Sequence, residues 1–274
     1  MLNSSFGVQL YSIRDLLDVD TGHTLHRLAE AGYRFVEPST TEQLVELAPL
    51  LDDLGLRVQS CHYDFAHVVE ANTEREVLAR MQAVVDQAQA LSVTCLVFPY
   101  LKPEQRETPS DYHRLADRLN LVGELTAARG IKHAYHHHNF EFAPLAGTRT
   151  SGWDVLCERL DKRITRLQLD VFWVAVAGLD PLAFLEEHES WIDLVHLKDL
   201  RIPFTQTFDE QGVTPSAFRA LGQGGLALES ILSFCARLPR PIALTVEQDF
   251  GTLILEELAA SARHLKVHLP ASRT

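Results

Sequence analysis

Acidic and histidine side chains recur where apolar, strand-like segments of the chain end. YHHHNFEF places Glu141 after three histidines, and LDVFW, HLKD and VEQD contain Asp170, His196 and Glu247. Three carboxylates and one imidazole favour Mn²⁺ as a ligand set, with Mg²⁺, Co²⁺ or Zn²⁺ as alternatives. Buried together without a cation, these acids would repel one another and carry a large desolvation cost. Singly, each could be an ordinary polar or salt-bridged residue, but together they predict a divalent-metal site.

The elements that would position these residues follow from eight short apolar segments that alternate with longer helical patterns. Nearly continuous apolarity is typical of parallel strands that are covered on both faces. With 274 residues, each strand–helix unit has about 34, enough for a strand, a helix and two loops. We therefore expect one (β/α)8 barrel domain over residues 1–274. The expected strands are 6–12, 33–38, 56–62, 93–100, 131–138, 164–172, 192–199 and 241–248.

An open, doubly wound sheet is the competing architecture. It usually needs a glycine-rich phosphate loop after its first strand, and QLYSIRDL contains no glycine. The longest irregular connection, residues 200–226, follows the seventh expected strand and is a candidate lid.

Strand alternation predicts which side chains enter the barrel, and active sites lie at the carboxyl ends of barrel strands. Because Leu167 and Leu169 suit the helix layer, Asp170 should point inward. The same argument places Tyr135 and His137 in the helix layer. The residues expected to face inward are His136, His138, Asp170, His196, Lys198 and Glu247, with Glu141 just beyond its strand.

Composition and charge exclude some classes of partner. A net charge of −12 argues against a nucleic-acid-binding surface, which needs a basic patch. No apolar stretch approaches the roughly 20 residues that cross a bilayer, and the N-terminus does not resemble a secretory signal. The four cysteines are scattered without a C-x-x-C pair, as expected for buried thiols of a cytoplasmic protein. We expect a cytoplasmic protein without membrane or nucleic-acid partners.

A set of motifs resembles the sugar phosphate isomerase/epimerase family, the xylose isomerase-like TIM barrels. They are GVQLYSIRD, YHHHNFEF, LDVFW, HLKD, LGQGG and VEQD, in this order over nearly the whole chain. The resemblance implies that Glu141, Asp170, His196 and Glu247 hold the metal. One departure from the family pattern HNHxFEF is His137 in place of asparagine, which we expect to change packing rather than chemistry.

The resemblance also implies a reaction. A sugar isomerase or epimerase of this kind moves a proton through a metal-bound cis-enediolate of a keto-sugar or related polyol, with Glu141 and Glu247 as the catalytic pair. Loss of a neighbouring hydroxyl would make the same site a dehydratase or lyase of the inosose or 3-keto-sugar type. An apurinic endonuclease-like phosphodiesterase is a remote alternative, because Trp173 stands where those enzymes have a further histidine ligand.

The expected substrate is a sugar or cyclitol. The sequence leaves open whether the protein forms a homo-oligomer. Each expected substrate contact could instead be a rim or packing residue. These contacts are Glu37, His62, His136, His138, Trp173 and Lys198.

Overall fold

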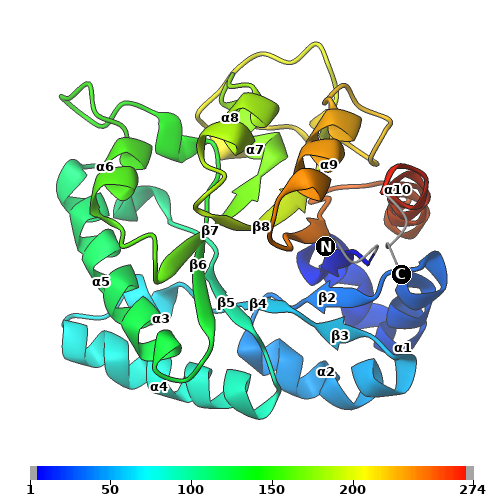
Figure 1. Ribbon diagram of the computed structural model, residues 1–274, viewed down its shortest axis with the longest axis horizontal. Coiled ribbons are helices and arrows are strands. Elements are labelled where there is room, and N and C mark those ends of the chain that lie inside the picture. The colour runs from blue at the N-terminus through cyan, green and yellow to red at the C-terminus, as the bar shows by residue number, and fades with distance from the viewer. Residues whose placement is uncertain (1–4, 270–274) are drawn as a thin grey trace.

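A barrel of parallel strands forms the centre of the protein and helices surround it (Figure 1). The computed structural model describes residues 5–269. Each of the eight expected segments contains an observed strand, which confirms the predicted barrel class. The strands are β1 (Gly7–Gln9), β2 (Phe35–Glu37), β3 (Arg57–Val58), β4 (Ser60–His62), β5 (Cys95–Phe98), β6 (Lys132–His136), β7 (Thr165–Asp170), β8 (Ile192–Leu197) and β11 (Ala243–Val246).

One expected strand, residues 56–62, closes the barrel. The sheet order is β3-β2-β1-β11-β8-β7-β6-β5-β4, and neighbouring strands within it pair in parallel. Only Gln59 separates β3 from β4, so the two edges of the sheet belong to one interrupted strand. β3 pairs with β2 and β4 pairs with β5, which leaves the barrel nearly closed.

Helices alternate with the strands and cover the outside of the barrel. Left-handed glycines end the first two, Gly32 with φ 105° and Gly55 with φ 66°, because glycine adopts this conformation without steric cost. No helix in residues 5–269 has the length and apolarity of a membrane span. The helices are α1 (Arg14–Ala31), α2 (Thr41–Leu54), α3 (Ala66–Val69), α4 (Glu74–Ala90), α5 (Pro109–Ala127), α6 (Gly152–Arg159), α7 (Val171–Val176), α8 (Pro181–Glu187), α9 (Leu228–Arg237) and α10 (Ile254–His268).

Apolar side chains fill the space between strands and helices. Leu167, Leu169 and Tyr135 belong to this outer core, as alternation predicts. Inside the barrel a small apolar cluster includes Cys95 and Ala134. Polar side chains occupy the strand ends beyond that cluster, so the interior changes from apolar to polar toward the carboxyl ends of the strands.

Connections at the strand ends carry the remaining short elements. A 3₁₀ turn, η3 (Phe140–Phe142), follows β6, and another, η1 (Leu10–Ile13), follows β1. The candidate lid, residues 200–226, includes β10 (Phe218–Arg219), which pairs antiparallel with β9 (Asp199–Leu200). The sequence did not predict this two-stranded sheet. The other short turns are η2 (Pro103–Gln105), η4 (Glu210–Gly212) and η5 (Pro215–Ala217).

Candidate metal centre

Four buried side chains bring potential metal-binding atoms together at the strand ends. His136 ends β6, Asp170 ends β7, His196 lies in β8, and Glu247 follows β11. One ligand atom from each lies within 4.8 Å of the others. Strand register explains the proximity, because Asp170 pairs with His196 across β7 and β8. Three of the four residues predicted as ligands are therefore neighbours.

Glu141, the fourth predicted ligand, lies elsewhere. It belongs to η3, where Oε1 accepts a 2.6 Å hydrogen bond from Tyr135 Oη and Oε2 accepts a 2.9 Å bond from the His138 amide. Tyr135 faces the helix layer, so the turn carries Glu141 away from the barrel axis. In the described residues Glu141 joins no group of converging donor atoms, and His136 stands in the cluster instead.

The hydrogen bonds of His136 leave one ring nitrogen free to bind a metal. Gln168 Nε2 donates to Glu37 Oε2 at 2.8 Å, which fixes the orientation of this amide. Gln168 Oε1, 3.0 Å from His136 Nδ1, must then accept the Nδ1 proton. Burial also lowers the pKa of His136 well below its usual value, so the imidazole is neutral. His136 Nε2 therefore carries a lone pair.

His196 lies between two carboxylates. Its Nδ1 is 2.7 Å from Glu247 Oε2, and its Nε2 is 2.6 Å from Glu37 Oε1. Burial opposes the charged form of His196, but the two carboxylates outweigh it and raise its pKa to about 10. Burial likewise opposes ionisation of Glu37, yet the charges of His196 and His62 hold its pKa well below the usual range. Glu37 thus lies below the pocket as a fixed acceptor for His196.

Lys198 contributes a positive charge to the same cluster. Its Nζ donates to Asp249 Oδ1 at 2.9 Å and lies 3.0 Å from Glu247 Oε2 and 3.3 Å from Asp170 Oδ2. Burial opposes the charge on Lys198, but the surrounding carboxylates raise its pKa well above its usual value. Lysine thus neutralises part of the acidic cluster.

The charges and free atoms of the cluster fit a divalent cation. Four carboxylates, Glu37, Asp170, Glu247 and Asp249, face the cations Lys198 and His196, which leaves two excess negative charges while His62, 3.1 Å from Glu37 Oε1, is neutral. One excess negative charge is left when His62 is also charged. Asp170 Oδ1 caps α7, whereas buried Asp170 Oδ2 has no hydrogen-bond partner in residues 5–269. Burial raises the pKa of Asp170 despite both neighbouring cations. The protein's own cations thus leave Asp170 incompletely stabilised, and a further cation would remove that cost.

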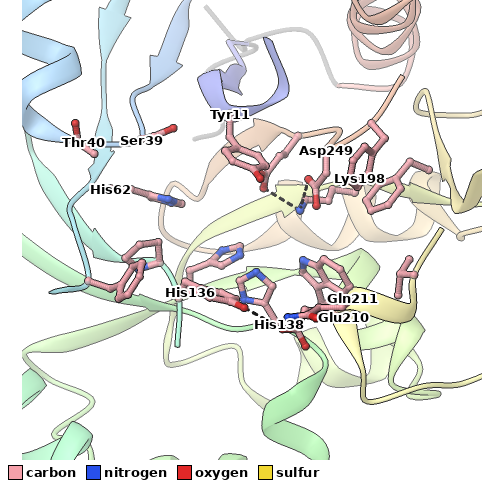
Figure 2. Close-up of a pocket in the computed structure, with 18 of the residues that line it drawn as sticks. Tyr11, Ser39, Thr40, His62, His136, His138, Lys198, Glu210, Gln211 and Asp249 are labelled. Atoms are coloured by element: carbon pink, nitrogen blue, oxygen red, sulfur yellow. Dashed lines mark hydrogen bonds and ion pairs between the residues drawn. The ribbon is translucent and has the colours of Figure 1, made fainter. Parts of the chain in front are cut away.

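A cavity of about 520 Å³ opens above the cluster (Figure 2). Five of the six predicted substrate contacts line it, and Glu37 lies beneath. Two buried donor or acceptor atoms at this pocket, His138 Nδ1 and Trp173 Nε1, lack a partner within the described chain. The lining residues are Tyr11, Ser39, Thr40, His62, Tyr63, Asp64, Phe65, Pro99, Tyr100, His136, His138, Trp173, Lys198, Glu210, Gln211, Val213, Phe218, Glu247, Asp249 and Phe250.

The segment 200–226 reaches over this pocket, as expected of a lid. Glu210 accepts from Tyr100 Oη at 2.9 Å and from Arg106 Nη2 at 2.5 Å, with both side chains of the Arg106–Glu210 pair only 10% exposed. Arg106 also stacks on Phe140, 3.3 Å from the ring centroid. These contacts join the lid segment to the connection that follows β5.

Sequence reasoning missed Asp249 and Gln168. Asp249 belongs to the VEQD motif, but it lies three residues beyond the end of β11, where alternation no longer fixes the direction of a side chain. Figure 2 shows Asp249 beside Lys198 at the pocket. Gln168 is an inward residue of β7 whose role depends on Glu37, 131 positions earlier in the chain. His137 packs against Trp153 in the helix layer, as predicted, and its Nε2 accepts the Asp170 amide proton at 3.1 Å.

Curated relatives carry a dehydratase name. One is inosose dehydratase 2 from Bacillus cereus, 27% identical over 185 residues that cover 64% of this chain. The chain spans only 56% of that relative's length.

Solved structures support the fold. A sugar phosphate isomerase/epimerase from Parabacteroides distasonis superposes with a TM-score of 0.76 at 22% identity, covering 96% of this chain and 93% of that one. A probable 3-DHS dehydratase from Bacillus anthracis superposes with a TM-score of 0.73 at 15% identity, covering 95% of this chain and 98% of that one.

Two further structures contain metals. The IOLI protein with bound zinc gives a TM-score of 0.71 at 16% identity, with 96% of both chains covered. A xylose isomerase-like TIM barrel protein from Mycobacterium smegmatis in complex with magnesium superposes with a TM-score of 0.70 at 14% identity, covering 97% of this chain and 98% of that one.

A match to a protein-family model assigns the chain to a family. The model described as a xylose isomerase-like TIM barrel matches residues 25–266, which is most of the sequence and includes all four clustered residues. The match confirms the resemblance inferred from the motifs: this chain belongs to the xylose isomerase-like TIM-barrel family.

Proposed function

We propose that this protein is a divalent-metal-dependent enzyme that removes the proton next to a carbonyl group of a sugar or cyclitol. The metal ligands would be His136, Asp170, His196 and Glu247; His196 would release its Nδ1 proton when the metal binds and keep its Nε2–H on Glu37. The observation that carries this proposal is the excess negative charge at the pocket floor, together with Asp170 Oδ2, which accepts no hydrogen bond from any described residue. A bound cation would polarise the substrate carbonyl and so make the neighbouring C–H more acidic.

The choice of metal follows from the ligand set. Two imidazoles and two carboxylates suit Mn²⁺, Zn²⁺ or Co²⁺ better than Mg²⁺, which prefers oxygen ligands. Zinc and magnesium in two solved relatives support metal binding at this fold. Mn²⁺ remains our first candidate and Zn²⁺ the second.

Asp249 and Lys198 are placed to move the protons. Burial raises the pKa of Asp249 above its ordinary value, which makes its carboxylate a better base at neutral pH than Glu247, whose pKa the neighbouring cations lower despite burial. Lys198 Nζ is held protonated 2.9 Å from Asp249 Oδ1. We assign Asp249 as the base and Lys198 as the donor to a substrate oxygen. Glu141, at the outer side of β6, has no part in this step.

The pocket favours a substrate without a phosphate group. Among the described lining residues Lys198 is the only lysine or arginine, and carboxylates already surround it. Burial lowers the pKa values of His136 and His138, so neither imidazole offers a positive charge. Trp173 presents an apolar ring and a free Nε1–H, a combination that suits a hydroxylated ring.

Elimination of water is the outcome we favour. It needs one base and one proton donor, the roles given to Asp249 and Lys198, and curated relatives named inosose dehydratase support it. Isomerisation or epimerisation is the second candidate, supported by structural likeness to proteins described as sugar phosphate isomerase/epimerase. Both outcomes begin with the same proton abstraction.

Incubation with keto-sugars and inososes in D₂O tests the proposal. We expect Mn²⁺-dependent reaction of at least one substrate, with loss of one water for dehydration or deuterium at unchanged composition for isomerisation or epimerisation. Asp170→Asn should lose bound metal and activity, whereas Asp249→Asn should keep the metal and lose activity. The exposed Glu42→Gln is the matched control. A metal-free protein or an Asp170→Asn variant with wild-type activity would refute the proposal.

A further inference from the structure

A second group of potential metal ligands lies on the outer helices. His264 and His268 are one turn apart on α10, and their ring centroids are 4.4 Å apart. Glu229 belongs to the first turn of α9, the orange helix in Figure 1. None of the three residues lines the pocket described above.

The distances between these side chains match a metal site better than an ion pair. Glu229 Oε1 lies 4.0 Å from His264 Nε2 and 3.9 Å from His268 Nε2. Both separations exceed hydrogen-bond length, so the carboxylate is at most a long ion-pair partner and is hydrogen-bonded to neither imidazole. Two ligand atoms on a tetrahedral zinc ion, each about 2.1 Å from the metal, are about 3.4 Å apart. A small side-chain movement would close the site.

His264 has a free ligand atom. Its Nε2 is buried and has no hydrogen-bond partner in the part of the chain that the structure describes. The side chain is 13% exposed, against 35% for His268 and 58% for Glu229, so His264 is the most buried of the three.

We propose that Glu229, His264 and His268 form a second Zn²⁺ site, with water as the fourth ligand, that clamps α10 to α9. His264 also packs against Gly222, where an added Cβ would collide with the ring. The Gly222 and Gly224 amides hold the Asp199 carboxylate, each at 2.9 Å. The clamp thus joins the last helix to the loop at the end of the lid segment.

The number of zinc ions bound per protein chain tests this second site independently of the enzyme's activity. After dialysis against equal low concentrations of free Zn²⁺, wild-type protein should hold two equivalents if the pocket cluster also binds, and His268→Ala should hold one fewer. Glu229→Gln should weaken the same equivalent at least tenfold. The control is His26→Ala, which removes an exposed histidine that lies 3.3 Å from Glu30 on α1 and joins no group of converging donor atoms in the described residues.

Nitrogen NMR identifies the ligands directly. Added Zn²⁺ should shift the Nε2 resonances of His264 and His268 together in wild type and in Asp170→Asn, where the pocket site is disabled. Zinc should also raise the melting temperature of Asp170→Asn, but not that of Asp170→Asn with His268→Ala. Equal zinc content in wild type and His268→Ala, or unmoved Nε2 resonances, would overturn the clamp and leave the pocket proposal standing.

Discussion

Replacement of Glu141 by glutamine separates the two roles that this residue could have. The glutamine is nearly isosteric, and it can hydrogen-bond to both partners of the glutamate, with the direction of the Tyr135 bond reversed. Its amide oxygen can accept from the His138 amide while its NH₂ group donates to Tyr135 Oη. The substitution therefore removes a buried titratable group with little change in packing.

The magnitude follows from the pKa of Glu141. Burial raises it to about 7 from an ordinary 4.5, against the lowering effect of the Tyr135 hydrogen bond. At about 1.4 kcal/mol per pKa unit, the difference corresponds to about 3 kcal/mol. The unfolded chain releases this proton near pH 4.5 and the folded chain near pH 7. Wild-type stability therefore falls between these two values, and Glu141→Gln should lack this loss.

Urea unfolding of metal-free protein at several pH values measures the effect. Glu141→Gln and wild type should be about equally stable near pH 4.5, and the variant should be more stable by about 3 kcal/mol above pH 7. Glu42→Gln, which alters an exposed glutamate, should follow wild type throughout. The variant should also keep its divalent metal. Parallel pH profiles for variant and wild type would refute the assigned environment of Glu141, and loss of metal would restore it as a ligand.

Three further perturbations probe the site. Glu37→Gln should weaken metal binding by about 10–100-fold, because the Nε2 atom of His196 loses its carboxylate partner. Isothermal titration with Mn²⁺ would show an unchanged affinity if Glu37 were only structural. Arg106→Ala should loosen the lid segment, because it leaves the nearly buried Glu210 without its cation. We expect faster proteolysis within residues 200–226, with replacement of the exposed Arg114 by alanine as the control. Equal cleavage of the two variants would contradict this role of Arg106. Chelation of divalent metal should lower the melting temperature, and added Mn²⁺ should restore it, because the cluster carries excess negative charge. An unchanged melting temperature would count against a resident metal.

The sequence predicted the barrel well because its strands are apolar and regular. The pleat fixes the direction of each side chain within a strand, so alternation placed Asp170, His196 and Lys198 inside the barrel. That rule ends where the strand ends. Beyond His136 the chain turns into η3, and the position of Glu141 depends on its contacts with Tyr135 and a backbone amide.

Long-range polar contacts were beyond sequence reasoning for a different reason. Glu37 and His196 are 159 positions apart, and no local pattern joins them. Closure of the barrel brings them within 2.6 Å. The place of Glu37 at the end of β2 predicts a residue near the pocket, but its function as an acceptor for His196 follows only from the three-dimensional arrangement.

The hydrogen bonds of Lys198 explain how a lysine and a metal ion can share one acidic cluster. A lysine that replaced the metal would have to satisfy all the nearby carboxylates, yet among the described residues Nζ donates a hydrogen bond of good geometry only to Asp249. Its approaches to Glu247 and Asp170 are ion-pair contacts, and Asp170 Oδ2 has no hydrogen bond within residues 5–269. Glu247 already accepts from His196. We infer that Lys198 and Asp249 act as a proton-transfer pair beside the metal, while Asp170, Glu247 and the two histidines hold it.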